Sequence, residues 1–334
     1  MVGRRVGVGV VLVALVLLAA GCGGNQDLLK PHSHPEHRIA TLWWVMMAGA
    51  WVGFSAIVFL LFLGWLRRNR KELPFGGGDR EATILLICLG VALPIVVLTL
   101  LFVWADIFVV KSTAAPSPRS TRMTIHVIGH QWFWEVRYPG TNAVTANEIH
   151  IPVGVPVDVI ATTDDVIHSF WVPELNRKID LIPGRENRIL LEADRAGRYR
   201  GRCAEFCGLQ HANMSLYVFA DPPARFRAWL ANMAKPARAP TTQQQKAGLA
   251  VFMSQACSGC HQIRGTQARG QVGPDLTHLQ TRTTIAALTL RNDEVDLGNW
   301  IIDPQHAKPG NKMPGLNIPG SQLDQLLAYL GSLR

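Results

Sequence analysis

The chain has no concentration of basic residues of the size that nucleic-acid binding requires. Its formal net charge is +9, but the excess is spread thinly over 334 residues. There are 10 basic and 6 acidic residues before residue 119, 14 and 12 in residues 119–235, and 8 and 6 after residue 238. A nucleic-acid-binding protein gathers its positive charge on one face or in one segment, so this class is excluded.

Charged residues are missing altogether from two long apolar segments. Residues 39–66 form a run of 28 without a charge, and residues 82–105 form one of 24. A helix needs about 20 apolar residues to cross a bilayer. We therefore expect transmembrane helices at about 41–66 and 82–105. Pro94 leaves the second helix without one backbone hydrogen bond, and packing against neighbouring helices in a membrane complex tolerates this loss.

The charges around these segments predict which way the protein faces. Four of the five residues in 67–71 are basic, and an excess of Arg and Lys in a short loop places that loop in the cytoplasm. Both ends of the helix pair then lie outside the cytoplasm. We expect a bacterial inner-membrane protein whose N-terminus and remaining domains face the extracytoplasmic side.

The N-terminus has the pattern of a secretory signal rather than of a third span. Arg4 and Arg5 precede 16 uncharged residues, which is too short for a span of about 20. Residues 18–22 resemble a bacterial lipobox. We expect a lipoprotein signal peptide at 1–21 and a segment 22–111 that begins at lipidated Cys22 and holds the helix pair; a plain membrane anchor with an idle cysteine is the alternative.

One loop gathers four ligands for a soft metal. Cys203 and Cys207 supply thiols, His211 an imidazole and Met214 a thioether. Thiolates and thioethers favour copper over hard cations, and a mononuclear blue-copper centre needs only one cysteine. Because two thiolates can each bridge two metals, and the carbonyl of Glu205 lies between them, the loop predicts a dinuclear copper centre.

A disulfide between Cys203 and Cys207 and a zinc site are the alternatives. A disulfide suits an exported domain but needs neither histidine nor methionine, and zinc has little use for a thioether. The second imidazole is expected from His168, because residues 166–173 are β-branched and aromatic and predict a strand.

Short segments of this kind follow the Pro-, Ser- and Ala-rich linker 112–120. Turn residues separate them, which is typical of a β-sandwich or barrel. Six further strands are expected, at 123–128, 132–138, 148–151, 155–161, 188–191 and 215–220. The copper domain is predicted to span residues 119–235, with a helical stretch at 221–233.

A second metal motif begins at Cys257 and continues through Cys260 to His261. Cys-x-x-Cys-His attaches c-type haem: each thiol adds to a vinyl group, and the adjacent histidine coordinates the iron. Zinc binding and a redox disulfide are the alternatives for a Cys-x-x-Cys pair. We expect a linker at 236–242 and a haem domain at 243–334.

Met313 is the only methionine after Cys260 and is therefore the expected sixth iron ligand. His278 and His306 are the alternatives. Ligation by Met and His raises the haem potential and leaves no open iron site, as an electron carrier requires. Residues 321–333 carry leucines at helical spacing and predict a packing helix.

These residues together resemble subunit II of haem–copper cytochrome c oxidases, with a fused C-terminal cytochrome c domain as in caa-type oxidases. The resemblance implies a multi-domain membrane protein: a two-helix transmembrane hairpin, an all-β cupredoxin-like domain (a Greek-key barrel or sandwich) and an all-α class I cytochrome c domain. It rests on residues 168–173, 178–185, 203–214, 257–261, 273–276, 299–305 and 312–315.

The resemblance also assigns ligands and neighbouring residues. It implies a binuclear CuA centre with these ligands: Cys203 and Cys207 on both coppers, His168 and Met214 on one, His211 and the Glu205 carbonyl on the other. The Glu205 carboxylate would touch a magnesium or manganese site shared with subunit I. Trp132 matches an exposed ring over the copper where electrons enter, although strand aromatics usually pack, as we expect of Trp134. Glu81 lies near an acidic position associated with proton uptake by subunit I; complementing the helix dipole is the alternative.

The sequence therefore predicts the electron-accepting subunit II of a proton-pumping terminal oxidase. Electrons would pass from haem c and CuA to the haem a and copper centre of subunit I, where dioxygen is reduced. The expected partners are subunits I and III, the membrane, and either a soluble cytochrome c or an upstream quinol-oxidising complex as donor. A membrane-anchored electron carrier for another reductase and a copper chaperone are the alternatives. No cysteine is left for a disulfide framework, because Cys88 is expected to be a small apolar residue within the membrane.

Overall fold

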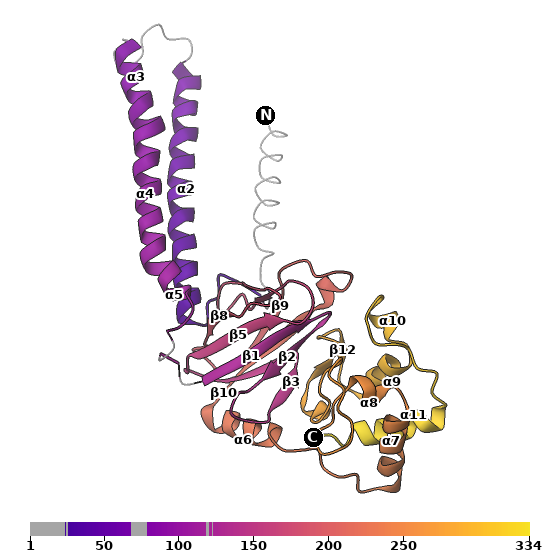
Figure 1. Cartoon of the computed structure of the whole chain (residues 1–334). Coiled ribbons are helices and arrows are strands. Elements are labelled where there is room, and N and C mark those ends of the chain that lie inside the picture. Colours follow the sequence, from indigo (N-terminus) through magenta and orange to yellow (C-terminus); the bar gives the residue numbers. More distant parts are fainter. Residues whose placement is uncertain (1–23, 25, 68–78, 118–119, 122) are drawn as a thin grey trace, which may run out of the picture.

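The computed structural model describes residues 24, 26–67, 79–117, 120–121 and 123–334. Figure 1 shows a pair of long helices, a β-sandwich and a mainly helical C-terminal part. The predicted lipidation site Cys22 and most of the basic loop 67–71 lie outside the described residues.

The two long helices lie side by side (Figure 1) and are apolar enough to cross a membrane. The first is α2 (His34–Arg67). The second consists of five consecutive pieces, two of them π-helical: α3 (Asp79–Ile87), η1 (Cys88–Ala92), α4 (Leu93–Trp104), η2 (Ala105–Val110) and α5 (Lys111–Thr113). Pro94 lies in the first turn of α4, directly after η1. Since proline cannot donate a backbone hydrogen bond, the wider π-turn accommodates it.

The β-sandwich contains two five-stranded sheets. Their strand orders are β3-β2-β1-β5-β8 and β4-β10-β9-β6-β7, and only β1–β5 and β4–β10 pair in parallel. The strands are β1 (Met123–His130), β2 (Phe133–Arg137), β3 (Val144–Ala146), β4 (Glu148–Pro152), β5 (Val157–Thr163), β6 (His168–Trp171), β7 (Ile179–Leu181), β8 (Asn187–Leu191), β9 (Gly197–Cys203) and β10 (Ser215–Asp221).

Alternating residues of the strands face one another between the sheets and form the sandwich core. Val127 of the first sheet and Val218 of the second are fully buried, as is Trp134. Burial of such side chains stabilises the fold by roughly 1.5–3 kcal/mol each. Helix α6 (Pro223–Met233) adds Phe226 and Met233 to the same core. This core gives the loops at one end of the sandwich a rigid base.

The C-terminal part has a hydrophobic core of its own. A capping box at Thr242 and Gln245 starts α7, and Phe252 of this helix packs edge-on against Tyr329 of α11. The helices are α7 (Gln243–Ser254), α8 (Cys257–Cys260), η4 (Leu279–Thr281), α9 (Glu294–Ile302), α10 (Pro304–Ala307) and α11 (Gly320–Leu330). Two-residue strands, β11 (Thr284–Ile285) and β12 (Leu290–Arg291), add a small hairpin to the predicted helical domain.

Candidate copper and haem sites

The predicted copper loop connects two neighbouring strands. β9 ends at Cys203 and β10 begins at Ser215, and the two strands pair in antiparallel fashion. The N–H of Cys203 donates to the carbonyl of Met214 at 2.9 Å, so the two ends of the loop are closed against each other. The intervening residues fold back through the short 3₁₀ helix η3 (His211–Asn213).

Closure of the loop brings the predicted ligands into one cluster. The Sγ atoms of Cys203 and Cys207 are 3.8 Å apart, without a disulfide. Nδ1 of His211 lies 3.7 Å and Sδ of Met214 3.8 Å from the Cys207 sulfur. The Cys203 sulfur also lies 3.1 Å from the carbonyl oxygen of Glu205. Two thiols, an imidazole, a thioether and a carbonyl therefore converge on one small volume.

His168 joins this cluster from the neighbouring strand β6. β6 pairs with β9 so that Phe170 lies opposite Cys203, and Nδ1 of His168 lies 3.8 Å from the Cys203 sulfur. The side chain fits because Gly129 lies beside it: a Cβ at this position would be 2.7 Å from Cδ2 of His168. Any larger residue would push the imidazole out of place.

Asp165 fixes the orientation of this imidazole. Its Oδ1 lies 2.9 Å from Nε2 of His168, and its Oδ2 accepts from the N–H of Gln131 at 2.6 Å. Although burial opposes ionisation, these hydrogen bonds hold the pKa of Asp165 well below its usual range. The ionised carboxylate holds the proton on Nε2 and leaves Nδ1 free to bind a metal.

One of the two thiols is prepared for metal binding in a similar way. Hydrogen bonding with the Cys207 thiol lowers the pKa of Cys203 despite burial, with further help from His168, whereas the same contact and burial raise the pKa of Cys207. The thiolate, not the thiol, is the form that binds metals. Both sulfurs are nearly inaccessible to water. This buried set of soft ligands with two imidazoles fits copper.

Trp132 lies directly beside the copper cluster. Its Nε1 donates to the carbonyl of Cys207 at 3.0 Å, and Nε2 of Gln131 donates to the same oxygen at 2.8 Å. The ring is half-buried rather than exposed, because the C-terminal domain lies against it. Trp134 is fully buried and packs edge-on against Phe170.

The exposed side of the copper loop carries Glu205, Phe206 and Leu209. Phe206 is 75% and Leu209 78% exposed. The Glu205 side chain is exposed, and in the described part of the chain it belongs to no group of three or more His, Cys, Asp or Glu side chains that could hold a metal. Glu81, in the first turn of α3, is likewise exposed.

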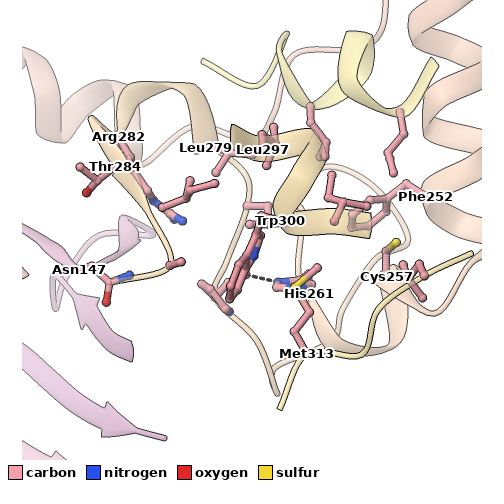
Figure 2. Close-up of a pocket in the computed structure, with 18 residues that line it drawn as sticks. Asn147, Phe252, Cys257, His261, Leu279, Arg282, Thr284, Leu297, Trp300 and Met313 are labelled. Atoms are coloured by element: carbon pink, nitrogen blue, oxygen red, sulfur yellow. Dashed lines mark hydrogen bonds between the residues drawn. The ribbon is translucent and has the colours of Figure 1, made fainter. Parts of the chain in front are cut away.

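The haem motif lines an apolar cavity in the C-terminal domain. Figure 2 shows Cys257, His261 and Met313 around the same space. Cys260 lines the adjoining part of the cavity. Nδ1 of His261 lies 2.8 Å from the carbonyl of Pro274, and burial lowers the pKa of this imidazole. A neutral ring with Nδ1 occupied offers Nε2 to a metal.

Two further features fit a haem. A Cβ at Gly273 would lie 2.5 Å from Cε1 of His261, so only glycine leaves room for this ring. Arg282 is buried at the wall of the cavity, and its Nε has no hydrogen-bond partner among the described residues. A buried guanidinium with a spare donor matches a carboxylate such as a haem propionate.

The alternative iron ligands lie elsewhere. Nε2 of the buried His278 lies 3.0 Å from the carbonyl of Lys235, and His306 is exposed. Neither lines the cavity that holds His261 and Met313. The structure thus brings together the predicted Cys257, Cys260, His261 and Met313.

The haem cavity opens onto the copper domain. Gln131, Trp132, Phe133 and Asn147 line it together with the haem motif. Trp132 therefore contacts both sites: its ring lines the cavity, and its N–H reaches the carbonyl of Cys207. Sequence reasoning did not predict Asp165, Gln131 or Arg282, because each acts through a partner far away in the chain or around a turn.

Two family models match the chain in succession. Residues 143–220 match "Cytochrome C oxidase subunit II, periplasmic domain", and residues 245–334 match "Cytochrome c". A solved structure of the periplasmic domain of subunit II of cytochrome oxidase from Bradyrhizobium japonicum is 30% identical. It covers 36% of this chain and 96% of its own, with a TM-score of 0.34.

Curated relatives match over almost the whole length. "Cytochrome c oxidase subunit 2" of Alkalihalophilus pseudofirmus is 33% identical over 332 residues, which is 96% of this chain and 95% of the relative. The protein of the same name from Bacillus subtilis is 27% identical and covers 97% of both chains. Since the match extends through the helix pair, the copper loop and the haem motif, the chain belongs to the cytochrome c oxidase subunit 2 family.

Proposed function

We propose that this subunit accepts electrons at a covalently bound haem c and passes them through a dinuclear copper centre to subunit I of a haem–copper oxidase. The observation that carries the proposal is the position of Trp132, between two complete ligand sets. Its indole N–H donates to the carbonyl of Cys207, and its side chain lines the haem cavity.

In the copper domain, the proposed ligands converge on one small volume. Cys203 and Cys207 would bridge both coppers. His168 and Met214 would hold one of the two ions, and His211 and the Glu205 carbonyl would hold the other. Copper supplies a one-electron redox centre here. The protein holds the two thiols close, orients the imidazole of His168 through Asp165, and excludes water, so little rearrangement is needed when the charge changes.

In the haem domain, Cys257 and Cys260 would hold the haem through thioether bonds, and His261 and Met313 would bind its iron. The carbonyl of Pro274 fixes the orientation of His261. Haem supplies a one-electron iron centre. With haem bound, the apolar wall and Met313 would favour the reduced iron and leave no position for dioxygen, so oxygen chemistry would belong to subunit I.

The assembly around this subunit is also proposed. The helices α2 and α3–α5 would anchor the chain in a bacterial inner membrane beside subunits I and III, with lipidated Cys22 as a further anchor. Both redox domains would face the extracytoplasmic side, where a soluble cytochrome c or a quinol-oxidising complex delivers electrons. The exposed Glu205 carboxylate would bind magnesium or manganese at the contact with subunit I.

The copper assignment is tested on the full chain purified in detergent. We expect two copper ions per chain and a paramagnetic resonance spectrum in which one unpaired electron is shared equally between them. Cys207→Ser should leave a signal localised on one copper, whereas Met214→Leu should keep most of the sharing, because a thioether is a weak axial ligand. A single copper in the unaltered chain, or a disulfide that persists in the metallated chain, contradicts the assignment.

A further inference from the structure

Lys308 lies at the contact between the haem and copper domains. It directly follows α10 and is only 2% exposed. Its Nζ donates to three backbone carbonyls, those of Asn213 at 2.9 Å, Ala286 at 3.1 Å and Trp132 at 3.3 Å. An ammonium group has three donors, so every proton of this buried charge has an acceptor.

The three acceptors belong to three different parts of the electron path. Trp132 follows β1 and lies between the two sites, and Asn213 immediately precedes Met214 in the copper loop. Ala286 lies in the turn between β11 and β12 and lines the haem cavity. Residues 286–288 all have φ between 53° and 69°, an unusual left-handed backbone for residues other than glycine. This turn directs the Ala286 carbonyl to the lysine.

Other contacts across the interface are uncharged, exposed to solvent or distant from the copper loop. Lys312 pairs with Asp165 at 3.4 Å, but its side chain is 54% exposed, so water and salt weaken the pair. Nε2 of Gln210 donates to the carbonyl of Pro309 at 2.6 Å. Among the described residues, only Lys308 joins both sites with a fully buried charge, which is costly to bury without such partners.

We infer that Lys308 is a positioning residue: its ammonium holds the haem domain docked on Trp132 and the copper loop, so that electrons cross from a fixed arrangement. The inference rests on the proposed function. In the step that it serves, one electron leaves the reduced haem iron and enters the oxidised copper centre. No bond forms or breaks, no proton has to move, and the external donor then reduces the haem iron again.

Without Lys308, docking would depend on the linker and the remaining contacts. Residues 234–242 belong to no helix or strand, but Arg264 donates to the carbonyl of Met233 at 2.7 Å and its own carbonyl accepts from the N–H of Ala237 at 2.8 Å. The linker therefore holds the haem domain next to α6, whereas Lys308 holds it at the copper loop. Burial lowers the pKa of Lys308 to about 8, so the ammonium form still predominates at neutral pH. The Lys308 side chain is therefore positively charged under the conditions of the test.

The test compares Lys308→Met with Lys246→Met in the full chain purified in detergent. Methionine keeps the apolar stem and removes the charge, and Lys246 is exposed on α7, away from the interface. We expect hydrogen-exchange protection of residues 129–134 and 284–291 to fall by about tenfold or more in Lys308→Met, since a hydrogen bond to a charged group contributes at least a factor of this size. Protection of β10 and α11 should not change. Unchanged interface protection, or an equal loss in Lys246→Met, overturns the inference.

A second measurement separates positioning from a purely structural role. Haem-to-copper electron transfer after flash reduction should become slower and dependent on solvent viscosity in Lys308→Met, because docking then limits the step. The copper potential should fall, since a nearby positive charge favours the reduced ion. A rate and a potential equal to those of Lys246→Met overturn the inference. The haem and copper contents of the unaltered chain are measured in parallel. If haem and copper are absent, the proposed function is refuted, whereas the hydrogen-exchange result still tests whether Lys308 holds the two domains together.

Discussion

Single residues outside the ligand set determine whether the ligands can act. Asp165 holds the imidazole of His168 and accepts from the backbone N–H of Gln131, and Gly129 leaves the space that this ring occupies. Such residues carry no recognisable motif. They are found only when the fold places them next to a ligand.

Replacement of Asp165 by asparagine should weaken copper binding. The amide side chain would keep the shape but lose the charge that holds the proton on Nε2 of His168, so the metal-facing nitrogen becomes less well oriented. Loss of such a supporting group typically lowers metal affinity about 10- to 100-fold. Competition with a copper chelator measures the affinity. Asp164→Asn is the matched control, because the neighbouring side chain is 63% exposed; equal losses in both variants would contradict the role of Asp165.

Removal of the Met313 thioether should open the haem iron. We expect Met313→Ala to bind carbon monoxide and to have a lower haem potential, because Met/His ligation raises the potential and fills the sixth position. His306→Ala should leave the low-spin spectrum unchanged, since His306 is exposed and outside the cavity. Ready binding of carbon monoxide by the unaltered chain would show that Met313 is not the ligand.

At the scale of helices and strands, apolar patterning predicted much of the fold. The two apolar helices and the all-β character of the copper domain are confirmed. The predictions omitted β3, β7 and β9. β3 and β7 are three residues each, and β9 has the sequence GRYRGRC, whose arginines and glycines do not favour a strand. Pairing with β6 and β10 makes β9 a strand, and this long-range effect is absent from local sequence.

The same limit applies to the sites. The ligand types and their spacing are local, so the sequence was sufficient to propose Cys203, Cys207 and the haem motif. The contact of Trp132 with both sites depends instead on how two domains dock. Lys308 was not proposed, because an isolated lysine in a loop has no pattern that indicates burial against three carbonyls.

A hydrogen bond between a histidine and a carboxylate joins β4 to β10 and makes the stability of the sandwich depend on pH. Nδ1 of His150 lies 2.7 Å from Oδ2 of Asp221, and this hydrogen bond lowers the pKa of the carboxyl group despite burial. A lowered carboxyl pKa contributes stability above the unfolded value of about 3.9 and loses it as pH falls through the folded value.

Asp221→Asn should therefore destabilise the sandwich at pH 7 by roughly 1.5–3 kcal/mol, the size of a hydrogen bond to a charged group. At pH 3 the difference from the unaltered chain should be clearly smaller. Urea unfolding, followed by tryptophan fluorescence at both pH values, measures the difference in the free energy of unfolding. A difference that is the same at pH 3 and pH 7 would show that the charge of Asp221 contributes nothing.

At the scale of the whole molecule, the haem domain covers the side of the copper domain on which Trp132 lies. The haem cavity and the copper cluster are in contact through Trp132 and its neighbour Gln131, which both line the cavity and donate to the Cys207 carbonyl. An external donor should therefore reduce the haem first, and the copper should receive its electrons only from the haem. The order of reduction becomes a property of the assembled chain rather than of either domain.

Replacement of Trp132 should separate these two steps. In Trp132→Leu, we expect an external donor to reduce the haem at the normal rate, whereas the following reduction of copper becomes slower, because the ring and its N–H bond to the Cys207 carbonyl are both lost. Trp132→Phe keeps an aromatic ring and loses the N–H group. Its rate of copper reduction should therefore lie between those of the unaltered chain and Trp132→Leu. Stopped-flow spectroscopy follows the haem and copper bands separately in the full chain. If both bands slow equally in Trp132→Leu, or if copper is reduced before haem in the unaltered chain, then electrons reach the copper by another route and Trp132 only packs between the domains.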